Sequence, residues 1–229
     1  MNDQPVAGRR WAQSPWIFLV ELTIVASLFA LDFYHHIFLS KVPFLFLLAW
    51  ASLRLRGLSW KDTGLVRFGS WAKTLSIGIA CGVGIELLEL FFTQPLFERL
   101  TGKAPDLRNF MAIRGNVKLA VLLLAFVWVV AAFGEEAVYR GYLMNRVAGV
   151  LKNGGAGWIV SLITVSILFG AAHLGQGITG QLENALDGLL LGGIYLACGH
   201  NLAVPIVAHG VTDTVDLLLL FLGKYPGLS

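Results

Sequence analysis

The sequence predicts an all-α fold, a polytopic transmembrane helical bundle of about seven to eight spans. Of the 229 residues, 56% are hydrophobic, and mean hydropathy is +0.72. Only 14% are charged, whereas about a quarter of the residues in a soluble domain are charged. Hydrophobic stretches near the ~20 residues needed to cross a bilayer recur along the whole chain. We therefore expect one integral membrane domain over residues 1–229, and not an anchor attached to a soluble domain.

The predicted spans follow the apolar stretches in order. The first stretch, 16–31, follows a polar N-terminus with Arg9 and Arg10 and lacks a small-residue cleavage site, so it is interpreted as a retained span and not a signal peptide. An eighth span requires a short or re-entrant segment within 105–117. The other predicted spans are 42–53, 75–92, 119–143, 158–173, 182–198 and 203–222.

The net charge of +3 comes from 17 basic and 14 acidic residues, and many of the basic ones gather between predicted spans. In a membrane protein such groups contact anionic lipid headgroups and influence topology, so they indicate a lipid bilayer as partner and no nucleic acid. Three spans after a cytoplasmic N-terminus would place the second group of basic residues on the outer side of the membrane. The orientation of the protein in the membrane therefore stays open. The two groups are Arg54, Arg56, Lys61, Arg67 and Lys73, then Arg99, Lys103, Arg108, Arg114 and Lys118.

Ionisable residues inside the predicted spans are the strongest functional signal. Each costs several kcal/mol in a bilayer unless it is paired or faces a polar cavity. Glu86 and Glu89, three residues apart, are expected to line a cavity or to pair with a basic neighbour. The candidates are Glu21, Asp32, Glu86, Glu89, Glu135, Glu136, Arg140, His173, Glu183, Asp187, His209, Asp213 and Asp216.

Two adjacent glutamates follow the apolar run at 119–130. Glu136 and Arg140 are four residues apart on one helix face, which is the spacing of an ion pair. Glu135 points about 100° away and has no obvious partner, which suits a general base. Taken alone, the pattern is also typical of a structural charge cluster near a helix end.

The next polar residue, His173, ends the following apolar run. The glycine-rich turn at 153–157 separates the two runs, and Glu135 and His173 each lie nineteen residues from Gly154. A continuous antiparallel hairpin would place both at the same depth, roughly 28 Å from its apex. A carboxylate and an imidazole at that depth could share one water molecule.

The last polar pair is His209 and Asp213, four residues apart in the final span. The carboxylate can orient the imidazole or act with it on a substrate oxygen. Helix counting places His209 about two turns past the turn at 198–201, nearer one membrane face than the estimate for His173. Spacing alone therefore does not bring the two histidines together.

These three motifs together resemble the CPBP family of intramembrane proteases, which includes the type II CAAX prenyl proteases and bacteriocin-processing homologues. The motifs are EExxxR at 135–140, FxxxH at 169–173 and HxxxD at 209–213, and the family-like catalytic core spans about 119–222. The resemblance implies a helical fold that encloses a polar intramembrane cavity. It also implies a multi-pass protein of the cell membrane, expected in the bacterial inner membrane, that hydrolyses a peptide bond of a membrane-associated protein or peptide.

The resemblance assigns roles to these residues. Glu135 would activate water as the base, and His173 would help to hold that water. His209 and Asp213 would stabilise the oxyanion, and Glu136 and Arg140 would position substrate or structure. Many relatives carry asparagine where this chain has Asp213, and a carboxyl group donates to an oxyanion only when protonated. Its alternative role is to orient His209.

Two alternatives stay open at this stage. Glu135, His173, His209 and Asp213 have the ligand types of a catalytic zinc site, but no HExxH motif is present, so we expect a site without a metal or other cofactor. The same intramembrane polar residues also occur in non-catalytic scaffolds and proton-coupled transporters. Inverted repeats would favour a transporter, and the sequence shows no internal repeat.

Overall fold

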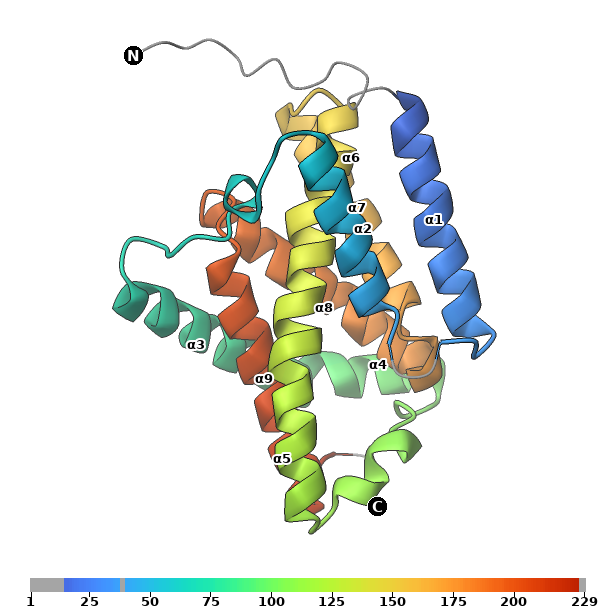
Figure 1. Cartoon of the computed structure of the whole chain (residues 1–229). Helices are drawn as coiled ribbons and strands as arrows, with labels where there is room; N and C mark the ends of the chain where they lie inside the picture. Colours follow the sequence, from blue (N-terminus) through green and yellow to red (C-terminus); the bar gives the residue numbers. More distant parts are fainter. Residues whose placement is uncertain (1–14, 38–39, 227–229) are drawn as a thin grey trace.

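Helices form the whole architecture of the described chain. The computed structural model describes residues 15–37 and 40–226, and within these ranges it contains helices and no strands (Figure 1). This confirms the predicted all-α fold, while Arg9 and Arg10 lie outside the described residues. The α-helices are α1 Pro15–Phe33, α2 Val42–Leu55, α3 Trp71–Leu88, α4 Gln94–Thr101, α5 Val117–Phe126, α6 Asn145–Val150, α7 Gly155–Ala171, α8 Gly177–Ala197 and α9 Ala203–Leu222.

Short 3-10 and π-helical segments link or extend these helices. The 3-10 helices are Trp60–Thr63, Arg108–Ile113 and Leu174–Gln176, and the π-helical segments are Glu89–Thr93, Val127–Glu135 and Ala137–Met144. The stretch 105–117, where an eighth span was considered, contains only the short 3-10 helix and loop.

Each predicted span falls on a helix, but the number of helices able to cross a bilayer is smaller than seven. Within residues 15–37 and 40–226, four helices are long and apolar enough, and the bent pair α7 and α8 adds a fifth if it counts as one span. The pair is bent by 59°. At 1.5 Å per residue, the 14 residues of α2 reach only about 21 Å, less than the ~30 Å of the hydrocarbon layer. The four helices are Trp16–Phe33, Trp71–Thr101, Val117–Val150 and Ala203–Leu222.

The helix Val117–Val150 explains why two glutamates directly follow an apolar run. Its first half faces outward, where the exposed fraction of Val121 is 63%. Its second half enters the centre of the bundle, and every residue of Ala137–Met144 is buried. Between these halves the backbone widens into π-helical turns, which occur frequently at functional sites. One straight element thus leads from the lipid-facing surface to the polar interior.

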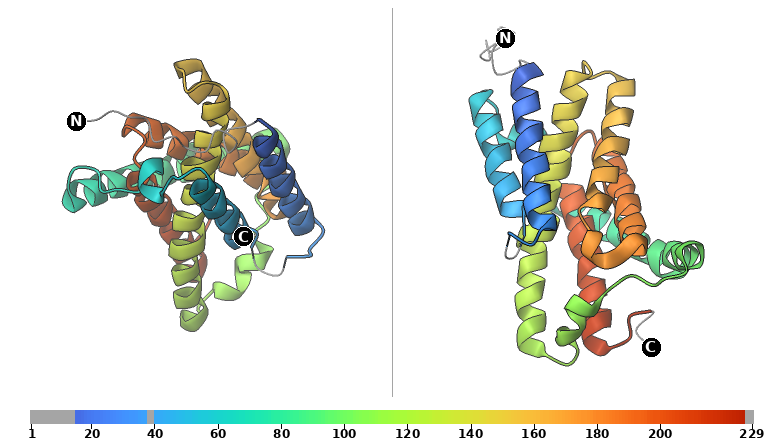
Figure 2. Two further views of the ribbon diagram at one scale, coloured as in Figure 1. Left: turned by 45° about the horizontal axis from the view of Figure 1, so that its top comes forward. Right: turned by 90° about the vertical axis from the view of Figure 1, so that its right-hand side faces the viewer.

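Helices α3 and α9 cross and pack against each other. The long helix Trp71–Thr101 runs across the direction of α1, α2 and α5–α6, and Figure 2 shows it nearly end-on in the right-hand view (Figures 1 and 2). Close packing against α9 depends on glycine, because a Cβ atom on Gly78 would lie 2.5 Å from the Cβ atom of Val207. This contact fixes α9 in the middle of the molecule.

The N-terminal helix is attached by a buried polar clamp. Glu21 in α1 forms an ion pair with Arg146 in α6, with 2.6 Å between Oε2 and Nε. The other oxygen of Glu21 accepts a hydrogen bond from Ser52 in α2, and Arg56 donates to the Ser52 hydroxyl at 2.9 Å. These contacts join α1, α2 and α6 outside the lining of the cavity described below.

Candidate active site

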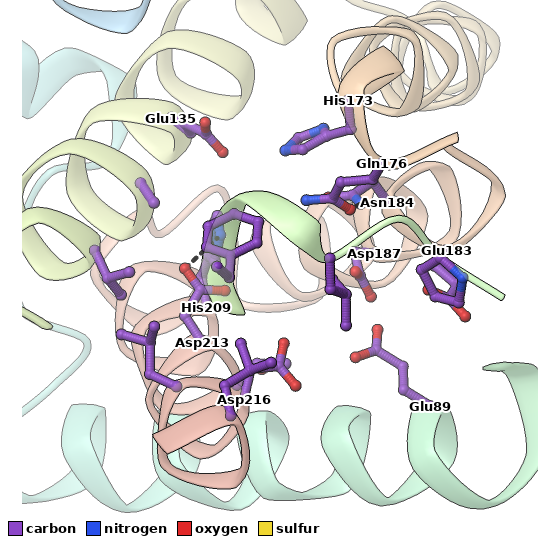
Figure 3. A pocket seen from close by; sticks show the side chains of 18 of the residues that line it. Glu89, Glu135, His173, Gln176, Glu183, Asn184, Asp187, His209, Asp213 and Asp216 are labelled. Carbon is purple, nitrogen blue, oxygen red and sulfur yellow. Dashed lines mark hydrogen bonds and ion pairs between the residues drawn. The ribbon is translucent and has the colours of Figure 1, made fainter. Parts of the chain in front are cut away.

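The predicted polar cavity lies where α8, α9 and the helix Val117–Val150 meet. It has a volume of about 300 Å³, and Glu135, His173, His209 and Asp213 all contribute to its lining (Figure 3). Apolar residues of the segment 102–116, including Leu107 and Phe110, line it as well. This segment is held against the α7–α8 bend, because the Asp106 backbone N–H donates to the Gln176 carbonyl at 2.8 Å.

Glu135 and His173 face each other in the upper part of the cavity in Figure 3. The Glu135 carboxylate makes no hydrogen bond or ion pair with any described residue. His173 Nδ1 lies 2.8 Å from the Phe169 carbonyl oxygen. Because a carbonyl only accepts, Nδ1 carries the proton of this hydrogen bond, and in the neutral ring Nε2 is left as an acceptor.

Glu136 is the partnered member of the glutamate pair. Its Oε1 atom lies 2.6 Å from Arg140 Nη1, and the side chains are 0% and 1% exposed, so the predicted ion pair is present and buried. The same oxygen lies 3.0 Å from His209 Nδ1. Sequence reasoning missed this second contact, since no spacing rule joins residues 73 positions apart.

Arg140 also connects the motif helix to α8. Its Nη2 atom donates to the Gly188 carbonyl at 3.1 Å, in addition to the bond from Nη1 to Glu136. Two nitrogens of one guanidinium thus bind acceptors on two helices, as its planar fork of donors allows.

His209 and Asp213 occupy one face of α9, as their spacing predicts. His209 Nε2 lies 3.5 Å from the nearer carboxylate oxygen of Asp213, while Nδ1 contacts Glu136. The imidazole therefore stands between two carboxyl groups. At 3.5 Å the contact with Asp213 is electrostatic and leaves room for Nε2 to turn toward a substrate oxygen.

Helix counting from the sequence placed His173 and His209 at different depths in the membrane. The folded chain does not show this difference. Helix counting assumed that every turn between helices lies at the membrane surface. Figure 1 shows that α9 begins well below the level of the turn between α6 and α7, because α8 runs diagonally after the 59° bend. Two turns into α9, His209 reaches the same cavity as His173.

Phe169 joins all three motifs, a role that sequence reasoning did not assign. Its ring centroid lies 4.9 Å from that of Tyr139 in an edge-on contact and 4.9 Å from that of His173. Arg140 Cζ is 4.7 Å from the same centroid, and the His209 ring lies 6.1 Å away. In the sequence, its position four residues before His173, one helical turn away, was the signal that could have indicated a contact between the two side chains.

Further carboxyl groups line the cavity beyond the predicted catalytic set. Glu89 does so, as one of the alternatives from the sequence proposed. Glu86 does not line the cavity, and it is buried without a basic partner among the described residues. The remaining acidic lining residues are Glu183, Asp187 and Asp216.

The zinc alternative at Glu135, His173 and His209 stays an alternative to the predicted site without a cofactor. Among residues 15–37 and 40–226, no three His, Cys, Asp or Glu side chains are grouped closely enough to hold a metal ion. Each histidine has Nδ1 engaged, by Phe169 or by Glu136, and keeps Nε2 available, as in histidines that bind a metal through one nitrogen. The absence of a cofactor stays a prediction.

Comparison with known proteins identifies the same part of the chain. Residues 117–215 match a family model described as type II CAAX prenyl endopeptidase Rce1-like. The match covers all three motifs and confirms their resemblance to the CPBP family. No curated protein and no solved structure matches the chain.

Proposed function

We propose that this protein is an intramembrane endopeptidase that hydrolyses a peptide bond of a membrane-associated protein or peptide by means of a water molecule activated by Glu135. The observation that carries the proposal is the unpartnered Glu135 carboxylate opposite His173 in the cavity (Figure 3). The match to the Rce1-like family over residues 117–215 supports a protease of the CAAX type.

In the proposed reaction, the Glu135 carboxylate accepts a proton from water as the water oxygen attacks the peptide carbonyl carbon. His173 Nε2 accepts the second hydrogen bond from that water, because Nδ1–H is committed to Phe169. The tetrahedral intermediate then collapses, the C–N bond breaks, and Glu135 returns the proton to the leaving amine. Atoms and charge balance without any further reactant.

The negative charge that develops on the substrate oxygen requires a donor. His209 supplies it through Nε2–H, while Glu136 fixes the ring through Nδ1. Asp213, 3.5 Å from Nε2, holds the proton on His209, or donates to the oxyanion itself when protonated. Arg140 keeps Glu136 ionised and in place, and so acts on the reaction through His209.

The experiment uses the purified full chain in detergent with a library of membrane-derived peptides and mass spectrometry of new termini. Glu135→Gln keeps the shape of the side chain but cannot take the proton, so cleavage should fall by about 10²- to 10⁴-fold. Glu98→Gln is the matched control, because Glu98 lies outside the cavity lining and accepts a hydrogen bond from Gln94 that glutamine can also accept.

Three outcomes would contradict parts of the proposal. Near-normal cleavage by Glu135→Gln removes Glu135 as the base. Loss of activity on chelation, restored by zinc, overturns the metal-free mechanism. A folded wild-type preparation that cleaves none of the peptides favours the non-catalytic scaffold or proton-coupled transporter.

A further inference from the structure

The lining of the cavity contains far more carboxyl groups than basic groups. Six of its described lining residues carry carboxyl groups, and none is lysine or arginine. The only nitrogen bases in the lining are two histidines, and His209 is already placed between two carboxyl groups. The six acidic residues are Glu89, Glu135, Glu183, Asp187, Asp213 and Asp216.

Three of these acids form a part of the cavity that the proposed hydrolysis does not use. Figure 3 shows Glu89, Asp187 and Glu183 on the side away from Glu135, with Glu89 and Asp187 pointing toward one another. Each has a buried oxygen without a hydrogen-bond partner among the described residues. They are called the acidic subsite below.

A fourth, deeper carboxyl group adds an independent sign of a missing partner. Glu86 is only 3% exposed and has no basic partner among the described residues. Its carboxyl group lies against that of Asp216, a lining residue. Buried carboxyl groups without a basic partner are costly, so a cation that enters the cavity would be held by them.

The ligand that suits these acids is an organic cation. The acids line a cavity of about 300 Å³, which is far larger than a single metal ion. Apolar lining residues such as Leu191 suit the methylene stem of a long basic side chain, which buries its stem and pairs its head.

We propose that the acidic subsite binds an arginine or lysine side chain of the peptide substrate, so that the protein selects peptides with a basic residue near the scissile bond. This inference rests on the proposed function, because it names the substrate class of the same cavity. Arginine should bind more tightly than lysine, since a guanidinium can bind several carboxylate oxygens at once.

Binding is measured with the Glu135→Gln variant, because loss of the proposed base should prevent cleavage of the bound peptide. Matched fluorescent peptides carry arginine, lysine, glutamine or norleucine at one position, and the position is scanned along the peptide. At one position the arginine peptide should bind about 10- to 100-fold more tightly than the glutamine and norleucine peptides, the range typical of a buried charge pair. The double replacement Glu183→Gln with Asp187→Asn should reduce this preference to about threefold or less, while binding of the norleucine peptide stays unchanged.

Asp62→Asn is the charge-matched control. Asp62 is exposed at the 3-10 helix Trp60–Thr63, and its hydrogen bonds from Ser59 lower its pKa, so the variant removes one real negative charge outside the cavity. It should leave the arginine preference intact. Norleucine-peptide binding reports whether each variant is folded, and Glu183→Gln alone carries the test if Asp187→Asn does not fold.

The outcomes separate this inference from the proposed function. Equal binding of arginine and norleucine peptides at every position overturns the subsite, even if the wild type cleaves both. A preference that survives the double replacement places the cation elsewhere and overturns the assignment. Preferential arginine binding without any cleavage by the wild type contradicts the peptidase and leaves the subsite standing.

Discussion

The carboxylates that pair with arginine and those without a basic partner lie in different regions of this protein and have different roles. Glu21 and Glu136 each pair with an arginine at 2.6 Å in a buried position, the first between α1 and α6 and the second within one helix. Glu135 and the acidic subsite lie around the cavity without a basic partner among the described residues. A buried charge is costly in low dielectric, so loss of one member of a buried pair destabilises the fold, whereas a carboxylate without a basic partner indicates a ligand or a reaction.

The largest effect should arise in the unpartnered region. His173→Ala and His209→Ala should each lower cleavage by about 10²-fold or more, and combining either with Glu135→Gln should add little, because groups that act on one water or one oxyanion are strongly non-additive. Cleavage rates of the single and double variants, corrected for folded protein, provide the measurement. If the loss of cleavage in a double variant equals the product of the two single losses, these residues do not act in one step.

The next effect lies in the partnered region. Arg140→Ala leaves Glu136 buried without its charge partner, at a cost of about 3 to 5 kcal/mol in the free energy of unfolding. Glu135→Ala, one residue before Glu136, should leave stability unchanged or raised because no partner is lost. Thermal unfolding in detergent compares the two variants. Equal stability would remove the distinction between the two glutamates.

A smaller stability effect is expected at the clamp of α1. Arg146→Ala should cost about 2 to 3 kcal/mol, because Glu21 keeps its hydrogen bond from Ser52. The residual folded protein should cleave at the wild-type rate per molecule, since Arg146 does not line the cavity. A change in the cleavage rate per folded molecule would show that the clamp also shapes the active site.

The smallest effect should come from Arg140→Lys, which keeps the charge. A lysine ammonium cannot bind Glu136 and the Gly188 carbonyl with the same planar geometry, so stability should fall by about 1 to 2 kcal/mol. Cleavage should fall as well, since Glu136 orients His209. Wild-type stability and activity in this variant would show that charge alone is sufficient.

Several features of the protein follow from its sequence alone. Composition and the recurrence of apolar stretches determine a helical membrane protein, because the bilayer excludes most other ways of satisfying backbone hydrogen bonds. The four-residue spacing of Glu136 and Arg140, and of His209 and Asp213, predicts pairs that the structure contains, because contacts within one helix depend only on helical geometry.

Contacts between helices were decided by the tertiary structure. The bond from His209 to Glu136, the central position of Phe169 and the gathering of Glu89, Glu183 and Asp187 around one cavity all join residues from different helices. They depend on the bend between α7 and α8 and on the close crossing of α3 and α9 at Gly78. Apolar stretches specify that helices form, but helix ends, crossing positions and tilts follow from side-chain packing between segments, which no spacing within one segment encodes.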